Sequence, residues 1–125
     1  MKIRQIFLLI TAIGLIPVAL SYGLMPQKSL SYLFNISVSN TNGIHIFRAV
    51  MGLYLALALF WTIGAFKVQV RQAALYSLIV FTLGLAAGRL LSFVVDGMPH
   101  WLLVVYFLVE LSLGILGMLL LEKSD

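Results

Sequence analysis

Residues 73–95 read AALYSLIVFTLGLAAGRLLSFVV, an apolar run that holds a single charged side chain, Arg89. A helix that crosses a membrane needs about 20 mainly apolar residues, because the hydrocarbon layer is about 30 Å thick. This run is long enough, and it contains no proline. It therefore predicts one transmembrane helix. Other apolar runs of similar length in the chain predict further helices of the same kind.

Similar apolar runs occur four times, with more polar breaks between them. We predict transmembrane helices at residues 6–25, 44–66, 73–95 and 101–121. Hydrophobic residues make up 62% of the 125-residue chain and charged residues 10%, whereas soluble domains have roughly 45–50% and about 25%. The composition argues against a soluble monomer. It predicts an all-α, four-helix transmembrane bundle that occupies residues 1–125 as a single domain.

The connections between the spans differ in length. Only the first, residues 26–43, is long enough to hold structure of its own, and we expect it to be an extracytoplasmic loop. Residues 32–36 are expected to lie along the membrane interface as a short helix, and Thr41 or Asn42 is expected to cap the second span. The second connection is predicted at residues 67–72.

The third connection reads DGMPH, residues 96–100. Glycine is common just after the end of a helix, and proline is common in the first turn of the next one. Gly97 and Pro99 therefore predict a tight turn that joins spans three and four as an antiparallel hairpin.

Basic residues near the ends of the spans predict the orientation of the chain, because lysine and arginine are enriched on the cytoplasmic side. One side holds most of these residues, namely Lys2, Arg4, Lys67, Arg71 and Lys123. Both termini are therefore predicted to be cytoplasmic. Aromatic residues favour the two membrane interfaces, and those predicted to lie there are Tyr22, Trp61, Tyr76 and Trp101.

The N-terminus permits a second interpretation. Two basic residues before an apolar run, with Ala19 and Ser21 as small residues near a possible cleavage point, also fit a secretory signal peptide. We favour a retained first span, since residues 6–25 are long enough to cross the membrane.

Three charged side chains lie inside the predicted spans, Arg48, Arg89 and Glu110. Each costs at least about 2.5–3.5 kcal/mol at a span centre, so each needs a partner or a cavity. Residues three or four apart share a helical face, and this spacing groups further polar side chains with them. We predict one polar cluster between spans two, three and four, made of His45, Arg48, Tyr54, Arg89, Ser92, Asp96, Tyr106 and Glu110.

Glycines accompany these polar faces. Small residues let transmembrane helices approach closely. We therefore expect close helix packing at Gly52, Gly84, Gly88, Gly114 and Gly117.

The predicted cluster has three interpretations. As a structural network, its two arginines and two carboxylates would cancel in charge and fix the register of the helices. As a pocket, its arginines would bind a lipid headgroup or a small anionic ligand through charge-assisted hydrogen bonds. As a proton- or cation-coupled path, Glu110 would exchange a proton with a substrate. The last interpretation implies a small transporter that acts as an oligomer, since four helices can hardly enclose a path.

Other classes of function have less support. The chain has no cysteine, so disulfides and thiolate metal sites are excluded. The residues Asp96, His100 and His45 lack the spacing of a metal site, and no cofactor motif is present. A membrane enzyme acting on lipid or quinone has no motif in its favour. The net charge is +4, but the basic residues are spread thinly instead of forming the basic face that nucleic acid requires.

Three blocks carry a resemblance to a known family: HIFRAVMGLYLALALFW (45–61), GLAAGRLLSFVVDGMP (84–99) and YFLVEL (106–111). In these blocks the chain resembles a bacterial family of small four-span membrane proteins known only as a domain of unknown function. The resemblance implies a multi-pass protein of the bacterial inner membrane, and it implies no chemistry. We therefore expect a non-enzymatic protein of the lipid bilayer that binds a lipid, a small anionic ligand or a membrane partner, or associates with itself.

Overall fold

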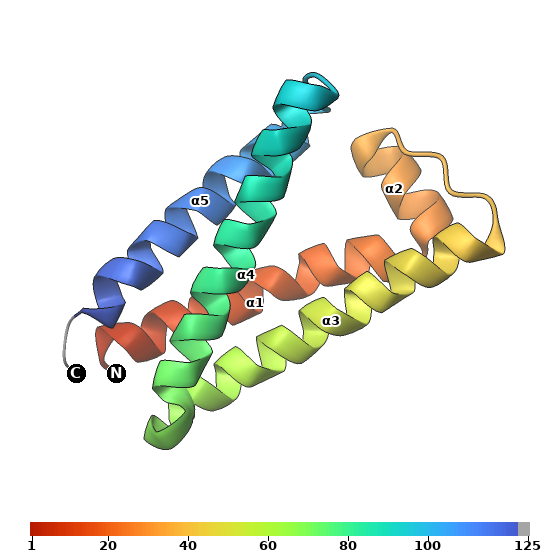
Figure 1. Ribbon diagram of the computed structural model, residues 1–125. Coiled ribbons are helices and arrows are strands. Elements are labelled where there is room, and N and C mark those ends of the chain that lie inside the picture. The colour runs from red at the N-terminus through yellow and green to blue at the C-terminus, as the bar shows by residue number, and fades with distance from the viewer. Residues whose placement is uncertain (123–125) are drawn as a thin grey trace.

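The computed structural model describes residues 1–122, and within them the chain forms five helices (Figure 1). They are α1 (Ile3–Gly23), α2 (Pro26–Phe34), α3 (Thr41–Phe66), α4 (Val68–Val95) and α5 (Trp101–Leu121). All except α2 are long and apolar enough to cross a membrane. The predicted all-α class with four membrane-capable helices is confirmed. Lys123, which entered the predicted orientation, lies outside the described residues.

The four long helices form two antiparallel pairs, α1 with α3 and α4 with α5 (Figure 1). The pairs are joined mainly by packing of α4 on α3, whereas α1 has little contact with α5. In Figure 1 the pairs meet near the N-terminus and spread apart toward the other end, where α2 lies. This arrangement leaves the inner sides of α1 and α5 without close packing against each other.

The start of α1 lies beside the end of α5. The Arg4 guanidinium donates a hydrogen bond through Nη2 to the carbonyl oxygen of Leu121, at 3.2 Å. Both helical ends therefore lie at the same end of the bundle. Which side of the membrane this end faces stays a prediction.

A core cluster of small and large apolar side chains fills the end where the two pairs meet; it consists of Leu8, Ala12, Ala58, Trp61, Ala65, Ala74, Leu75 and Leu78. Trp61 is fully buried in it, and its indole Nε1 donates a hydrogen bond to Ser77 Oγ at 3.0 Å. Trp61 therefore packs between helices instead of facing lipid, and its depth in the membrane stays a prediction. The alanines leave room for the large ring, and Ser77 satisfies its one polar atom.

Helices α3 and α4 are joined by one residue, Lys67. The predicted connection at residues 67–72 is therefore wrong, since α4 begins five residues earlier than expected. Arg71, the fourth residue of α4, is buried, and its Nε and Nη2 donate to the carbonyl oxygens of Gly64 and Ala65, both at 3.1 Å. Gln5 donates to Ala65 as well, at 2.9 Å. Carbonyls in the last turn of a helix lack intrahelical partners, so these side chains complete the end of α3.

Replacing Arg71 with lysine is expected to lower the free energy of unfolding by about 1 kcal/mol. An ammonium group lacks the planar fork with which the guanidinium holds two carbonyls at once. Unfolding in detergent by titration with dodecyl sulfate measures the change. The exposed Arg48→Lys is the matched control and should leave the stability unchanged; equal losses in the two variants would contradict the assigned role of Arg71.

The first connection contains a longer helix than predicted. Pro26 opens α2 at its first position, and Asn35 closes it in the left-handed region with φ of 59°. Pro26, Leu30 and Phe34 recur at four-residue steps, so they share one face, which is buried. The helix therefore joins the core instead of only lying along an interface. The predicted range, residues 32–36, overlaps only the last three residues of α2.

The first turn of α3 is also shifted. Its N-cap is Asn40, whose Oδ1 accepts a hydrogen bond from the backbone N–H of Gly43 at 2.7 Å. Thr41 and Asn42, which were predicted as caps, lie inside the helix.

The glycines predicted at helix contacts divide into two groups. Gly114 and Gly117 of α5 pack directly against α4, where a Cβ would collide with Leu83 or come within 2.8 Å of Ile79 Cγ1. At the other three glycines an added Cβ would have no described atom within 4 Å; they are Gly52, Gly84 and Gly88. These three differ from the expectation because they lie on exposed faces of their helices.

Candidate functional site

Arg89 of α4 and Glu110 of α5 form a bidentate ion pair. Nε donates to Oε1 at 2.7 Å and Nη2 donates to Oε2 at 3.2 Å. The two side chains are only 19% and 14% exposed. The guanidinium also lies over the ring of Tyr106, 5.9 Å from its centroid. The ion pair of Arg89 and Glu110 therefore carries no net charge.

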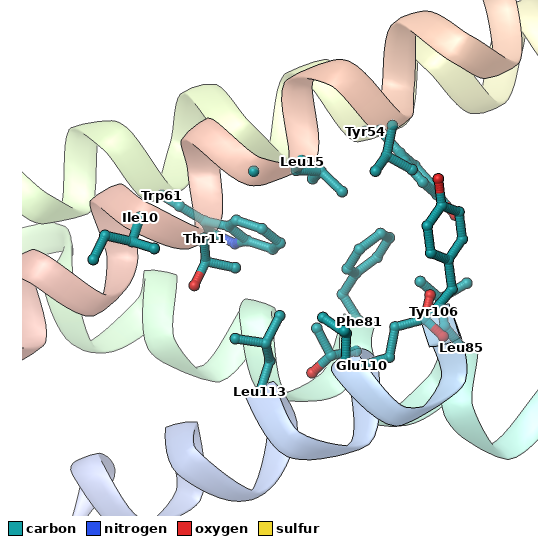
Figure 2. A pocket seen from close by; sticks show the side chains of 14 residues that line it. Ile10, Thr11, Leu15, Tyr54, Trp61, Phe81, Leu85, Tyr106, Glu110 and Leu113 are labelled. Carbon is teal, nitrogen blue, oxygen red and sulfur yellow. The ribbon is translucent and has the colours of Figure 1, made fainter. Parts of the chain in front are cut away.

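A cavity of about 280 Å³ lies beside this ion pair and is lined by all four long helices (Figure 2). Its floor comes from α3 and α4, where Tyr54, Trp61 and Thr82 are buried. Its rim comes from α1 and α5, where Ile10 and Val109 are 64% and 49% exposed. The cavity therefore opens sideways between α1 and α5. Both rim residues are well inside helices that can span a membrane, so in a bilayer the opening would face the hydrocarbon layer.

The cavity has one polar and one apolar end. Figure 2 shows Tyr54, Tyr106 and Glu110 toward one end, and Ile10 and Trp61 toward the other. The difference follows from position along the helices, because Tyr106 and Glu110 lie in the first half of α5 and Tyr54 at the middle of α3, whereas Trp61 lies two turns further along α3.

The polar side chains that line the cavity differ in whether they have protein partners. Thr11 and Thr82 donate hydrogen bonds to carbonyl oxygens of their own helices, at 2.7 and 2.8 Å. In contrast, the hydroxyls of Tyr54 and Tyr106 make no hydrogen bond to any group within residues 1–122. A tyrosine hydroxyl can both donate and accept a hydrogen bond. The polar end of the cavity can therefore bind a hydroxyl or a carbonyl group.

A series of aromatic contacts connects α2 to the cavity. Tyr22 contacts Phe34 and Tyr54, with ring centroids 5.9 and 5.6 Å apart. Tyr54 contacts Phe81 at 5.0 Å, and Phe81 contacts Trp61 at 5.7 Å. The series passes along the cavity wall from its polar end to its apolar end. Aromatic pairs at these separations favour offset or edge-to-face geometry, so the wall is shaped by rigid rings.

Sequence reasoning did not identify Tyr22, Phe34, Phe81 or Trp61 as part of this site. A signal was available for Phe81, which shares a helical face with Leu85 and Arg89 at four-residue steps. No such signal existed for Phe34, since its contact with the site depends on the fold of α2.

The structure divides the predicted polar cluster. It brings Tyr54, Tyr106, Arg89 and Glu110 together around the cavity. Ser92 lies one turn from Asp96 and donates a hydrogen bond to its Oδ2 at 2.6 Å, at the exposed end of α4.

His45 and Arg48 lie exposed on the opposite side of α3. The buried face of this helix carries Tyr54, Ala58 and Trp61. At about 100° per residue, His45 is turned about 180° from Tyr54 and Arg48 about 120°. The prediction that His45 and Arg48 belong to one cluster with Arg89 and Glu110 is therefore wrong, because the face of α3 that packs on α1 and α4 is the apolar one. Within residues 1–122 no three His, Asp or Glu side chains come together as a metal site would require.

Comparison with known proteins identifies a family and no characterised relative. The family described as "Domain of unknown function (DUF4345)" matches residues 3–121. The match includes all five helices, so it extends the resemblance of the three sequence blocks to α1 and α2. No curated protein and no solved structure matches the chain.

Proposed function

Because the chain belongs to the DUF4345 family, whose description assigns no activity, we propose a function from its cavity: binding of an uncharged lipophilic molecule that carries a hydroxyl or carbonyl group. The protein is then a non-enzymatic, multi-pass membrane protein, and the family resemblance favours the bacterial inner membrane. The supporting observation is an apolar cavity whose polar end has a charge-balanced ion pair and two tyrosine hydroxyls that have no hydrogen-bond partner among residues 1–122.

The ion pair favours a neutral ligand over a small anion. An anion would have to displace Glu110 from Arg89 or lie beside its carboxylate. Like charges repel strongly where the dielectric is low, and displacement would break both hydrogen bonds between Arg89 and Glu110. A neutral ligand can instead hydrogen-bond to Tyr54 and Tyr106 while the ion pair stays intact.

The size of the cavity limits what it can hold. An apolar cavity of about 150 Å³ binds benzene, and ligand sites generally span about 300–1,000 Å³. The 280 Å³ here is therefore sufficient for a compact ring molecule or part of one lipid chain, but not for a whole phospholipid. Access between α1 and α5 would let such a molecule enter from the membrane without crossing water.

Quenching of Trp61 fluorescence tests this proposal directly, since Trp61 is fully buried at the apolar end of the cavity. The exposed Trp101 is first replaced with phenylalanine, which leaves one tryptophan. The probe is a medium-chain alcohol brominated at its far end. Its hydroxyl should lie at Tyr54 and Tyr106, and its bromine should then quench Trp61 in a saturable manner.

A variant that fills the cavity provides the decisive comparison. Gly14 lines the cavity, and a Cβ there meets no described atom within 4 Å, so Gly14→Phe should fold and reduce probe affinity at least about ten-fold. Gly84→Phe is the matched control, because Gly84 is equally open but does not line the cavity. Equal quenching in the two variants would refute binding in the cavity. The brominated carboxylate of the same length should quench less than the alcohol; tighter binding of the carboxylate would refute the neutral ligand class.

A further inference from the structure

A second polar feature lies on the exposed side of α3, away from the cavity. It is a shallow hollow lined by Thr41, Ile44, His45, Arg48 and Ala49. His45 and Arg48 are exposed and three residues apart, so they share one helical face. The hollow shares no residue with the cavity beside Glu110.

The length of α3 places this hollow at the edge of the hydrocarbon layer. The helix has 26 residues and is thus about 39 Å long, at 1.5 Å per residue, whereas the hydrocarbon layer is about 30 Å thick. Lys67 follows directly after Phe66, so one boundary lies near Phe66. About 20 residues back from Phe66, the other boundary lies near Phe47. Arg48 is therefore at the boundary, and His45 is within the headgroup layer.

The direction of the side chains adds to this placement. In a helix the Cα–Cβ bonds tilt toward the N-terminus. The long side chain of Arg48 therefore extends from the boundary toward His45 and the headgroups, as arginines near helix ends do. Its guanidinium and the imidazole of His45 can reach the same layer of the membrane.

Arg48 has no anionic protein partner within residues 1–122. The carboxylate of Glu110 is held by Arg89. Asp96 accepts a hydrogen bond from Ser92 at the end of α4, and Glu122 follows α5 at the opposite end of the bundle. A charge at the edge of a low-dielectric layer is costly without a counter-charge, and in the headgroup layer that counter-charge is the phosphate of a lipid.

We propose that His45 and Arg48 form a binding site for the headgroup phosphate of an anionic phospholipid, in the leaflet at which α3 begins. The planar guanidinium donates two parallel hydrogen bonds to phosphate oxygens. His45 donates a ring N–H to the same headgroup, and Ile44 and Ala49 contact the first methylene groups of the lipid. This site is independent of the cavity and of the function proposed for it.

Native mass spectrometry of the purified protein tests the site. The protein in detergent is titrated with phosphatidylglycerol or with phosphatidylcholine that has the same acyl chains. The wild type should bind one phosphatidylglycerol in preference to phosphatidylcholine. Arg48→Gln should lower the occupancy of that lipid about five-fold, because a cation near an anionic headgroup strengthens binding by about that factor. His45→Gln should lower it by a smaller factor.

The control variant is Lys67→Gln, which removes an exposed cation at the other end of α3 and should leave this occupancy unchanged. Equal occupancy in wild type and Arg48→Gln would overturn the proposal, as would equal binding of the two lipids by the wild type. Displacement of phosphatidylglycerol by millimolar inorganic phosphate would also overturn it, since it would assign the site to a soluble anion. Arg48 is exposed, so Arg48→Gln should fold, and an unchanged elution volume in size-exclusion chromatography checks this.

Discussion

Replacing Glu110 with leucine is expected to lower the free energy of unfolding by about 3–5 kcal/mol, the largest effect that we predict for a single substitution. Glu110 supplies both oxygen atoms that accept from Arg89. Without it the guanidinium remains between α4 and α5 with its charge uncompensated. Arginine cannot lose its proton in a protein, so it has no means of becoming neutral there.

The converse substitution should cost less. In Arg89→Leu the carboxyl of Glu110 can take up a proton, which removes its charge and leaves only a hydrogen-bonding group without a partner. The expected loss is about 1–3 kcal/mol. This asymmetry distinguishes an ion pair inside a membrane bundle from simple loss of packing, which would affect the two positions in proportion to the volume removed.

The double variant Arg89→Leu/Glu110→Leu completes the cycle. Replacement of a buried pair with apolar residues is often neutral for stability, so we expect a value within about 1 kcal/mol of the wild type. Titration with dodecyl sulfate, followed by circular dichroism, gives all four free energies of unfolding. If Arg89→Leu proves more damaging than Glu110→Leu, or if the losses of the single variants add in the double variant, then the pair does not have the role described here.

The second large effect is expected at Gly64. A Cβ added there would lie 2.5 Å from the Cβ of Ala74, an atom fixed to the backbone of α4. Because neither atom can rotate away, Gly64→Ala should force α3 and α4 apart and lower the free energy of unfolding by about 1–3 kcal/mol. The carbonyl of Gly64 also accepts from Arg71, so the shift would disturb that hydrogen bond too.

Gly84→Ala is the control for this prediction, since a Cβ at Gly84 meets no described atom within 4 Å. Alanine favours helix over glycine by about 0.5–1 kcal/mol, so this variant should be slightly more stable than the wild type. The same denaturant titration measures both. Opposite signs for the two substitutions are expected, and destabilisation of equal size would show that the contact with Ala74 is not the cause.

The places where prediction from sequence failed have a common physical origin. The polar residues at 67–72 predict a connection, but glutamine and arginine form helix well, and tertiary contacts bury Arg71 at the end of α3. Tryptophan is frequent at membrane interfaces, but this preference does not indicate that Trp61 is buried between helices, in the space that the alanines around it leave for the indole. In both cases the type of residue does not predict its environment, because that environment depends on which residues are its neighbours in the folded structure.

The sequence by itself determined the number of long helices, their approximate bounds and the residues with unusual chemistry. Hydropathy has this power because the hydrocarbon layer sets both the length and the polarity of a span. Residues 101–121 were predicted with the bounds that α5 has. Arg89 and Glu110 were identified because charges are rare and costly in such segments.

The tertiary structure alone decided which polar groups meet. Every long helix here is apolar around most of its circumference, so hydropathy does not mark which face packs inward. The orientation of α3 about its own axis places Tyr54 at the cavity and Arg48 on the exposed side. The two side chains are about 120° apart around that axis. The cavity arises from the poor contact between α1 and α5, a property of helix packing that no single segment of the sequence contains.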